Sequence, residues 1–599
     1  MIRRTHAYLI VPCLTAALVG CATVPEPERP TGDETDRPDA PQPIPAETPP
    51  VAELELPELE LLPRPRPPVP GLSGDDLFRL LVADLAGRSG DAETALANYL
   101  DAARVQGDPR VAQRATRLAL HLGDSDAALQ ATQRWTELAD ESKDAHAVLA
   151  RLWLQHERAD RAEAALRRVV ALTDGGVAAG LREVADLVVD SEHPETALTA
   201  MHAIGDDYPE AAIVHYALGE LFARTDEPEP ALAALDRALD LESYHADALV
   251  LRARIQLEQG QPEVAFEQLG RAYRERPDDR GLALGYVNLL VEAGRVQQAK
   301  QEMQRVHERF GQDPFAVRTL ALLAMQAQIW DHATLYLERL VAMNARTSMA
   351  RYYLGRIAEQ QGDCTRALRH FVKVGQGEHR FDAELRAALC MAEVGRVDEA
   401  RLHLERMQAQ YQSGEAVARI AIMHARIERQ SGEPARALEV LSQALERHGE
   451  HAELRYARAL TAAEVDRFDV ARRDLNAVLE RDPEDARALN ALGYLLADRG
   501  LELDRARELI ERALAQHPDD PAMLDSMGWV LFRQGQSEEA LDYLQRAYEL
   551  DPGPEIAAHL GEVLWTLGRR DDARHVWQTG REQGPENDVL KRTTQRFEP

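Results

Sequence analysis

Aromatic side chains are scarce in this chain, and positive charges are outnumbered by negative ones. Of its 599 residues, 70 are Lys or Arg and 101 are Asp or Glu, which gives a formal net charge of -31 at pH 7. Because so acidic a protein repels a phosphate backbone, nucleic-acid binding is excluded as its main activity. Phe, Trp and Tyr make up only 5% of the residues, and the mean hydropathy is -0.40. These values favour Ala- and Leu-rich helices whose outer faces meet solvent.

The chain also lacks the short motifs of common enzyme sites. It contains no H-E-x-x-H, no G-x-S-x-G, no Walker loop and no C-x-x-C. His448 and His451 lie close together, but Gly449 between them indicates a loop between helices, and the spacing offers a metal ion no further ligands. We therefore predict a protein without catalytic residues, a bound metal or a cofactor.

What the chain does contain is a 34-residue pattern, clearest in three successive copies from Leu489 to Pro585. Apolar residues at helical spacing give each helix one buried face, and a Gly about seven residues later lets the chain leave that helix in a left-handed conformation. Small residues such as Gly528 and Ala540 allow two antiparallel helices to touch closely. A Pro such as Pro552 then ends the second helix.

The small residue of the second helix recurs from one end of the pattern to the other. Its 15 positions are Ala95, Ala127, Ala162, Ala197, Ala231, Ala265, Ala299, Ala333, Ala367, Ala400, Ala437, Ala471, Ala506, Ala540 and Ala573. An apolar or aromatic residue stands four residues after each of them, where it can pack back on the first helix. The first three copies are the least regular, and the interval from Ala400 to Ala437 carries an insertion. The pattern predicts an all-α solenoid of about 15 helix pairs.

This spacing resembles the tetratricopeptide repeat, whose small-residue and Pro positions match here residue by residue. The resemblance implies a right-handed superhelix over residues 71–587, with the first helices lining a groove, and a C-terminal tail at 588–599. Residues expected to face the groove are Tyr216, Glu220, Arg224, Tyr352, Arg356, Gln360, Asp525, Trp529 and Arg533. Mixed aromatic and charged residues suit protein binding, although any one of them could instead belong to a solvated helix face. Trp529 is the strongest candidate, because a large apolar ring that faces solvent indicates a binding site.

Residues 1–20 have the pattern of a bacterial lipoprotein signal peptide. Two arginines precede a short apolar run, and the tetrapeptide that ends at Cys21 resembles the lipobox. The run is too short for a comfortable transmembrane helix. The resemblance implies a lipid on Cys21, and Ala22 after it favours anchoring to the periplasmic face of the outer membrane. The alternative is an ordinary secretory peptide in which Cys21 is incidental.

Residues 21–70 are rich in Pro and in acidic side chains. Such a segment cannot bury enough apolar surface to offset its ordering entropy, so we predict a disordered tether. Fully extended, the tether could hold the repeats on the order of 100 Å from the membrane. The leucine-rich stretch between Leu54 and Leu62 is an exception, which could dock on a partner, dock on the solenoid or simply be part of the tether.

Cysteine is almost absent, with four residues in the whole chain. Cys13 would be lost with the signal peptide and Cys21 would be acylated, which leaves Cys364 and Cys390 in an oxidising compartment. These two residues could form a disulfide or remain as two packed thiols. The sequence favours the thiols.

Three C-terminal segments narrow the resemblance further. Asn490 to Tyr494, Asp525 to Trp529 and Pro554 to Trp565 are similar to segments of proteobacterial outer-membrane repeat lipoproteins. One member of that group is the binding partner of a periplasmic carboxyl-terminal processing protease. A shorter repeat lipoprotein similarly brings the same class of protease to peptidoglycan hydrolases.

The resemblance therefore implies a non-enzymatic adaptor that brings such a serine protease together with its substrates. The alternative is a scaffold for the assembly of outer-membrane machinery or of envelope polysaccharide export machinery. A repeat-bearing transferase is disfavoured, because no catalytic domain remains outside the repeats.

Overall fold

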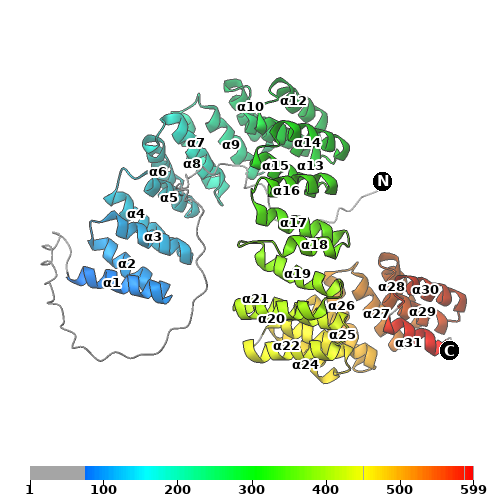
Figure 1. The fold of residues 1–599 in the computed structure, drawn as a ribbon. Coiled ribbons are helices and arrows are strands. Elements are labelled where there is room, and N and C mark those ends of the chain that lie inside the picture. Colours follow the sequence, from blue (N-terminus) through cyan, green and yellow to red (C-terminus); the bar gives the residue numbers. More distant parts are fainter. Residues whose placement is uncertain (1–73, 450, 586, 598–599) are drawn as a thin grey trace, which may run out of the picture. The chain divides into compact units, whose positions relative to one another are not determined.

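The computed structural model describes residues 74–449, 451–585 and 587–597. Within these ranges the chain forms 31 helices and no strand, so the predicted all-α fold is confirmed (Figure 1). The predicted signal peptide at 1–20, the lipid on Cys21 and the tether at 21–70 lie outside the described residues. None of the described helices is both long and apolar enough to cross a membrane.

The helices are arranged as 15 consecutive antiparallel pairs, and the two helices of every pair pack against each other. The first helices of the pairs are α1 (Gly74–Ser89), α3 (Pro109–Leu122), α5 (Lys143–Gln155), α7 (Val177–Val189), α9 (Ala212–Arg224), α11 (Ala246–Glu258), α13 (Arg280–Glu292), α15 (Pro314–Gln326), α17 (Thr347–Gln360), α19 (Arg380–Glu393), α21 (Gly414–Gln430), α23 (Ala452–Glu464), α25 (Ala486–Arg499), α27 (Pro521–Arg533) and α29 (Pro554–Thr566). The second helices are α2 (Ala92–Val105), α4 (Ser125–Leu138), α6 (Ala159–Leu172), α8 (Pro194–Asp207), α10 (Pro228–Leu241), α12 (Pro262–Glu275), α14 (Val296–Phe310), α16 (Trp330–Ala342), α18 (Cys364–Phe371), α20 (Val397–Gln410), α22 (Pro434–His448), α24 (Phe468–Arg481), α26 (Leu503–Gln516), α28 (Ser537–Leu550) and α30 (Arg570–Gln583). One more helix, α31 (Asp588–Phe597), follows the last pair.

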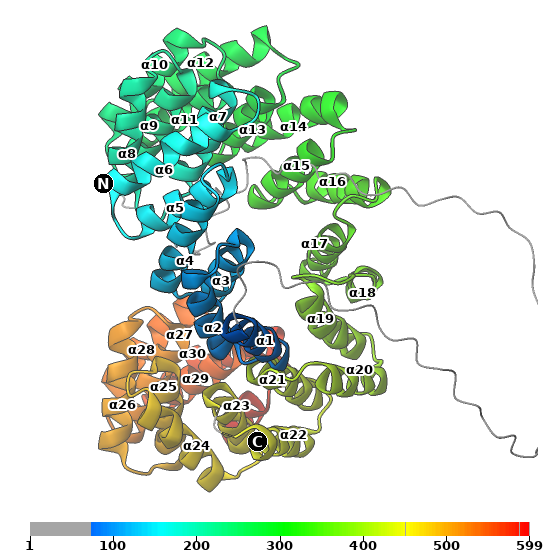
Figure 2. The ribbon, with the colours of Figure 1, turned by 90° about the vertical axis from the view of Figure 1, so that its left-hand side faces the viewer.

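These helices fall into two compact units, α1 to α14 and α15 to α31, which join between Phe310 and Gly311. The pairs of each unit follow one another in chain order in Figures 1 and 2. Within a unit, first helices repeatedly contact the first helix of the next pair, as α9 does with α11 and α25 with α27. Contacts of this kind between successive first helices recur in both units.

The predicted small-residue positions set the spacing within the pairs. All 15 lie on second helices, and 14 of them are fully buried. The remaining one was wrong by a single residue, because Ala128 is fully buried in α4 and Ala127 is not. Thr132, four residues after Ala128, shares a hydrogen bond of 3.2 Å with Thr116 of α3. A polar Thr pair therefore replaces the predicted apolar contact, which hid the register in the sequence.

The turn between the two helices of a pair requires a left-handed residue. With Ala128 as the second marker, the Gly five residues before the marker Ala has a φ between 68° and 86° in all nine copies that carry one: Gly90, Gly123, Gly260, Gly294, Gly362, Gly395, Gly432, Gly535 and Gly568. Four other copies place a residue with a side chain there: Glu157, Asp226, Gln328 and Asp466, with φ between 55° and 62°. Because a left-handed conformation costs such residues about 1–2 kcal/mol, the pair geometry and not the local preference imposes the turn.

Two helices depart from the usual length. The insertion predicted between Ala400 and Ala437 lies mainly in α21, which has 17 residues where most first helices have 13 or 14. In contrast, α18 has only 8 residues, and the chain from 372 to 379 is not α-helical. The ninth pair is therefore the one with a shortened second helix.

Residues 588–599, which the sequence assigned to a tail, hold the helix α31 over most of their length. Leu590 is buried, and the Phe597 ring lies 5.9 Å from those of both Trp565 and Trp577. Such a helix closes the open end of the last pair, as a repeat array requires of its terminal element.

Candidate functional site

The nine predicted groove residues occupy three equivalent positions on first helices. They lie three residues before, one after and five after a buried Gly, which is Gly219, Gly355 or Gly528. A Cβ atom on Gly528 would lie 2.5 Å from Leu544 Cγ and 3.0 Å from the Ala540 carbonyl oxygen of the paired helix. Because residues four apart lie on one stripe of a helix, the three positions share a face, and the Gly contact fixes its direction.

Trp529 does not face outward as predicted, because its side chain is only 6% exposed. Its ring stacks on His559 of α29 with centroids 4.2 Å apart and touches Phe532 at 5.5 Å. The Arg533 guanidinium lies 5.7 Å from the ring centre. The reason is the close contact between the first helices α27 and α29, which encloses side chains that would otherwise point into solvent.

Asp525 and His559 form a buried pair between α27 and α29. The two carboxylate oxygens lie 2.9 and 3.0 Å from His559 Nδ1, and both residues are at most 5% exposed. Burial lowers the pKa of His559, but the charge and the hydrogen bond of Asp525 raise it more, so the pKa lies above its usual value. The carboxylate of α27 thus holds the imidazole of α29 and favours its protonated form.

Tyr494 of α25 extends this arrangement across a third helix. Its hydroxyl donates to Glu555 Oε1 of α29 at 3.2 Å, and its ring lies 5.9 Å from that of His559. Burial, followed by the charge of Glu555, raises its pKa well above the usual value. We call Asn490, Tyr494, Asp525, Trp529, Glu555 and His559 the C-terminal cluster.

Two polar atoms of the C-terminal cluster are buried without a hydrogen bond. Among the described residues, neither Asn490 Oδ1 nor Trp529 Nε1 has a partner. Buried polar groups are normally paired, so one unpaired acceptor and one unpaired donor require an explanation. A polypeptide could supply both an N–H donor and a C=O acceptor.

The predicted residues of the ninth pair are joined to the pairs that follow. The Tyr352 hydroxyl donates to Asp382 Oδ2 at 2.8 Å and accepts from Arg356 at 3.0 Å, while its ring stacks on His379 at 4.5 Å. Burial raises the pKa of Asp382, but hydrogen bonds from Arg386 and Tyr352 lower it more, and the net pKa is low. Gln360, by contrast, is exposed. Tyr352 and Arg356 thus belong to a network between α17 and α19.

In the first unit, Tyr216 and Glu220 are half-buried residues of α9. Tyr216 stacks on His245, the N-cap residue of α11, at 5.1 Å, and burial followed by the charge of Glu220 raises the pKa of Tyr216. Burial also raises the pKa of Glu220 more than Arg254 and Arg224 lower it. The carboxylate is therefore held where its charge is poorly solvated.

The arginines at the third position have a structural role. Arg224 donates to the carbonyl oxygens of Val189 and, at 2.6 Å, Ser191, where α7 ends. Arg533 donates in the same way to the Asp498 carbonyl oxygen near the end of α25, at 2.5 Å. Each cation satisfies acceptors that a helix C-terminus leaves open, so it holds neighbouring pairs together.

The structure thus brings Asp525 and Trp529 together with partners that the sequence analysis missed. Asn490 and Tyr494 occupy the same two positions relative to Gly493 as Asp525 and Trp529 do relative to Gly528. His559 lies within the segment Pro554 to Trp565, which the sequence had singled out for its ancestry. Alignment of the three segments on their Gly residues could have found Asn490 and Tyr494, but not His559.

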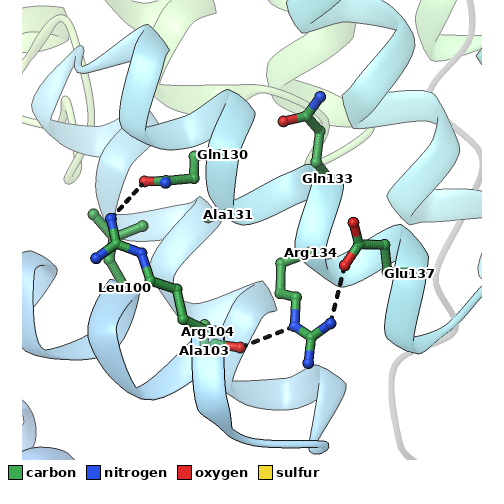
Figure 3. A pocket seen from close by; sticks show the side chains of 8 residues that line it. All are labelled: Leu100, Ala103, Arg104, Gln130, Ala131, Gln133, Arg134 and Glu137. Carbon is green, nitrogen blue, oxygen red and sulfur yellow. Dashed lines mark hydrogen bonds and ion pairs between the residues drawn. The ribbon is translucent and has the colours of Figure 1, made fainter.

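A surface hollow between two consecutive second helices shows a different pattern. The hollow in Figure 3, of about 280 Å³, lies between α2 and α4. In it, Arg104 donates to Gln130 at 3.3 Å, and Arg134 donates to the Ala103 carbonyl oxygen at 3.1 Å and to Glu137 at 2.9 Å. Because these side chains already pair with one another, the hollow is a seam between helices. Nowhere in the described parts of the chain do three or more His, Cys, Asp or Glu side chains gather so as to hold a metal ion.

The raised pKa of His559 predicts how stability depends on pH. A group whose pKa is higher in the folded state stabilises fully below its unfolded pKa of about 6.5 and loses this effect as pH rises through the folded pKa. We expect the free energy of unfolding to fall as pH rises from about 6, and Asp525→Asn to flatten this dependence. Urea denaturation over a pH series measures both. His575→Gln, which removes an exposed imidazole from α30, should leave the slope unchanged; an equal effect of the two substitutions would contradict the buried pair.

Comparison with known proteins identifies the repeats. A family model described as "Tetratricopeptide repeat" matches residues 185–246, 226–280, 318–374, 422–465, 456–502 and 501–555. A second model with the same description matches residues 256–329 and 531–593. The chain is also 34% identical over 529 residues to the TPR repeat-containing protein PA4667 of Pseudomonas aeruginosa, a match that covers 88% of each protein.

Solved structures with this type of fold also match. A tetratricopeptide repeat protein from Parabacteroides merdae covers 42% of this chain and 98% of its own, with 16% identity and a TM-score of 0.35. A chain of the Cut9–Hcn1 hetero-tetramer of the APC/C covers 88% of this chain and 97% of its own, with 12% identity and a TM-score of 0.32.

Proposed function

The chain belongs to the tetratricopeptide repeat family, a family of protein-interaction scaffolds, and we propose that it is a non-enzymatic adaptor lipoprotein of the outer membrane. In this proposal it binds a periplasmic serine protease of the carboxyl-terminal processing class together with substrates such as peptidoglycan hydrolases. A lipid on Cys21 holds it to the periplasmic face of the membrane, and residues 21–70 give it reach. Holding protease and substrate on one chain raises their effective concentration.

The observation that carries the proposal is the C-terminal cluster. It holds a Trp and a Tyr on adjacent first helices, beside the buried pair of Asp525 and His559. Aromatic anchors of this kind dominate the binding energy of protein interfaces. The unpaired Trp529 N–H and the Asn490 side-chain carbonyl are enclosed in the free protein, and a bound polypeptide backbone would pair with them only if the side chains over them moved aside on binding.

The membrane part of the proposal is supported by the N-terminal sequence alone. Two arginines, a short apolar run and the lipobox-like tetrapeptide before Ala22 form the set of features that directs lipidation. Replacing Cys21 with Ser should release the protein from the membrane fraction. If the variant stays with the outer membrane, the lipid is not the anchor.

Trp529→Phe separates binding from stability. The change keeps a large ring at the same place but removes the indole N–H, which has no partner within the described chain. The smaller ring leaves a cavity at this buried site, so we expect a modest loss of stability, whereas affinity for the partner falls about tenfold, the value of one lost hydrogen bond in an interface. Trp565→Phe is the matched control, because Trp565 packs near α31 at the closed end of the array, away from the C-terminal cluster.

Cross-linked pull-down from membranes identifies the partner on which these variants are compared. Recovery of a serine protease with the wild-type protein, and its loss with Trp529→Phe but not with Trp565→Phe, supports the adaptor. Recovery of barrel-assembly or polysaccharide-export proteins in place of a protease would favour the scaffold. Equal recovery of the protease by both variants would show that the C-terminal cluster is not part of the binding surface.

A further inference from the structure

Two cysteines lie side by side between the ninth and tenth helix pairs. Cys364 is the first residue of α18, and Cys390 lies in the last turn of α19. Their Sγ atoms are 2.7 Å apart, and the residues are 7% and 0% exposed. No part of the proposed protein-binding site includes them.

The geometry points to a disulfide bond between Cys364 and Cys390. Non-bonded heavy atoms pack best at about 3.5–4.0 Å, so two thiols do not fit at the observed separation. A disulfide needs only a small further approach of the two side chains, to about 2.05 Å. The sequence left both forms open, and the contact between the sulfurs decides between them.

The bond would join the ninth and tenth pairs beside the shortened helix. Second helices elsewhere have 13 to 15 residues, but α18 has 8 and is followed by a non-helical stretch from 372 to 379. A covalent bond from the first residue of α18 to the end of α19 would link the two pairs directly. It would also close a loop across two pairs, which restricts the unfolded chain.

The surroundings make thiols at these two positions unreactive once the chain has folded. Burial raises the pKa of Cys364, and the neighbouring Cys390 thiol and Glu393, whose carboxylate lies 2.9 Å from Cys364 Sγ, raise it further. Burial likewise raises the pKa of Cys390. Because the thiolate is the form that exchanges, folded thiols here would react slowly. The bond must therefore form before α19 packs on α18, and burial then shields it from reductants.

The reaction needs an electron acceptor, which is the disulfide of a thiol–disulfide oxidoreductase. The thiolate of one cysteine attacks that disulfide and forms a mixed disulfide, while the first oxidoreductase sulfur leaves as a thiolate. The second cysteine then displaces the other sulfur. Two thiols lose two protons and two electrons, and the oxidoreductase gains them as a dithiol. In the cell this step requires export to an oxidising compartment, so it rests on the proposed function.

Peptide mapping of the full chain tests the bond. Protein isolated from membranes is alkylated under denaturing conditions, digested and analysed without reduction. We expect one cross-linked species that joins the Cys364 and Cys390 peptides, lighter than the two thiol peptides by the mass of two hydrogen atoms. Alkylation of both cysteines before reduction, in protein that is membrane-bound, would overturn the disulfide without touching the adaptor function.

A second experiment makes the test independent of export. The full chain with Cys13→Ser and Cys21→Ser is refolded in a mixture of oxidised and reduced glutathione. We expect the cross-linked species to form, and reduction to lower Tm by about 5 °C. The same chain carrying Cys364→Ala and Cys390→Ala should not respond to reductant. A refolded chain that keeps two free thiols in oxidising buffer would overturn the proposal.

Discussion

Replacing Arg401 with Met is expected to lower the free energy of unfolding by about 3–5 kcal/mol, the usual cost of leaving a buried charge without its partner. Arg401 of α20 donates two hydrogen bonds, of 2.7 and 2.6 Å, to the Glu428 carboxylate of α21. The Glu428 side chain is 0% exposed, so water cannot replace the guanidinium. In the variant, His424 at 3.3 Å and Arg436 at 3.9 Å still lie near the Glu428 carboxylate, so we expect a loss at the lower end of this range. Urea denaturation followed by circular dichroism measures it.

Two variants make this result specific. Arg396→Met removes an ion pair with Glu399 in which both side chains are about half exposed, so it should cost less than ~1 kcal/mol. The double variant with Arg401→Met and Glu428→Met removes both charges and should recover most of the loss. If Arg401→Met costs no more than Arg396→Met, Glu428 is not enclosed as the structure has it.

The same pair predicts a dependence on acid. Burial raises the pKa of Glu428, but the hydrogen bonds and charge of Arg401 lower it more, so the pKa lies below the ordinary value of 4.5. A group with a lowered pKa stabilises fully above its unfolded pKa and loses this effect as pH falls through the folded pKa. The difference in the free energy of unfolding between wild type and Arg401→Met should therefore shrink as the pH falls below 4.5 and through the folded-state pKa of Glu428.

The helix-pair architecture could be predicted because close packing admits few residue types. Where two helices touch at Gly528, the neighbouring Ala540 and Leu544 leave no room for a Cβ atom. That restriction recurs with the repeat, so it is visible in the sequence as evenly spaced small residues. The left-handed turn has the same property, because only Gly adopts it without cost. Thr116 and Thr132 show where such a prediction fails, since a hydrogen-bonded pair can replace the small apolar contact between two helices and shift the apparent register.

The C-terminal cluster could not be predicted to the same extent, because its contacts join different repeats. Asp525 meets His559, which is 34 residues away, and Tyr494 meets Glu555, which is 61 residues away. A pattern within one repeat shows which face a side chain is on, but not what the next repeat places against it. For this reason Trp529 was expected in solvent and lies buried against His559 instead.

Buried charges were hidden for a related reason. Charged residues make up 29% of the chain, so single carboxylates such as Glu428 and Asp474 do not stand out. Asp474 is also 0% exposed and accepts hydrogen bonds from Arg455 at 3.1 Å and from Arg458 at 2.6 and 2.8 Å. Each such carboxylate joins two neighbouring helices, and its hydrogen bonds form only when those helices pack in the correct register. Buried ion pairs thus add specificity to an array that small apolar contacts alone would leave free to slip.

The second large effect is expected from Gly561→Ala, which should lower the free energy of unfolding by about 2 kcal/mol despite the better helix propensity of Ala. A Cβ atom on Gly561 of α29 would collide with the indole of Trp577. Trp577 cannot yield, because it is fully buried and its ring stacks on those of Trp565 at 5.5 Å and Phe597 at 5.9 Å. The strain should pass through these rings to α31, so hydrogen exchange at residues 588–597 should become faster.

Gly414→Ala provides the matched control for this substitution. Gly414 begins α21 in the same unit, and a Cβ atom there would meet nothing within 4 Å. The change should alter stability by no more than about 0.5 kcal/mol and should leave exchange at α31 unchanged. If Gly561→Ala behaved like Gly414→Ala, α29 and α30 would not be in contact at Gly561. The spacing of small residues would then fail as the determinant of the helix pairs, because Gly561 is the described glycine at which an added Cβ atom would lie closest to another atom, Trp577 Nε1.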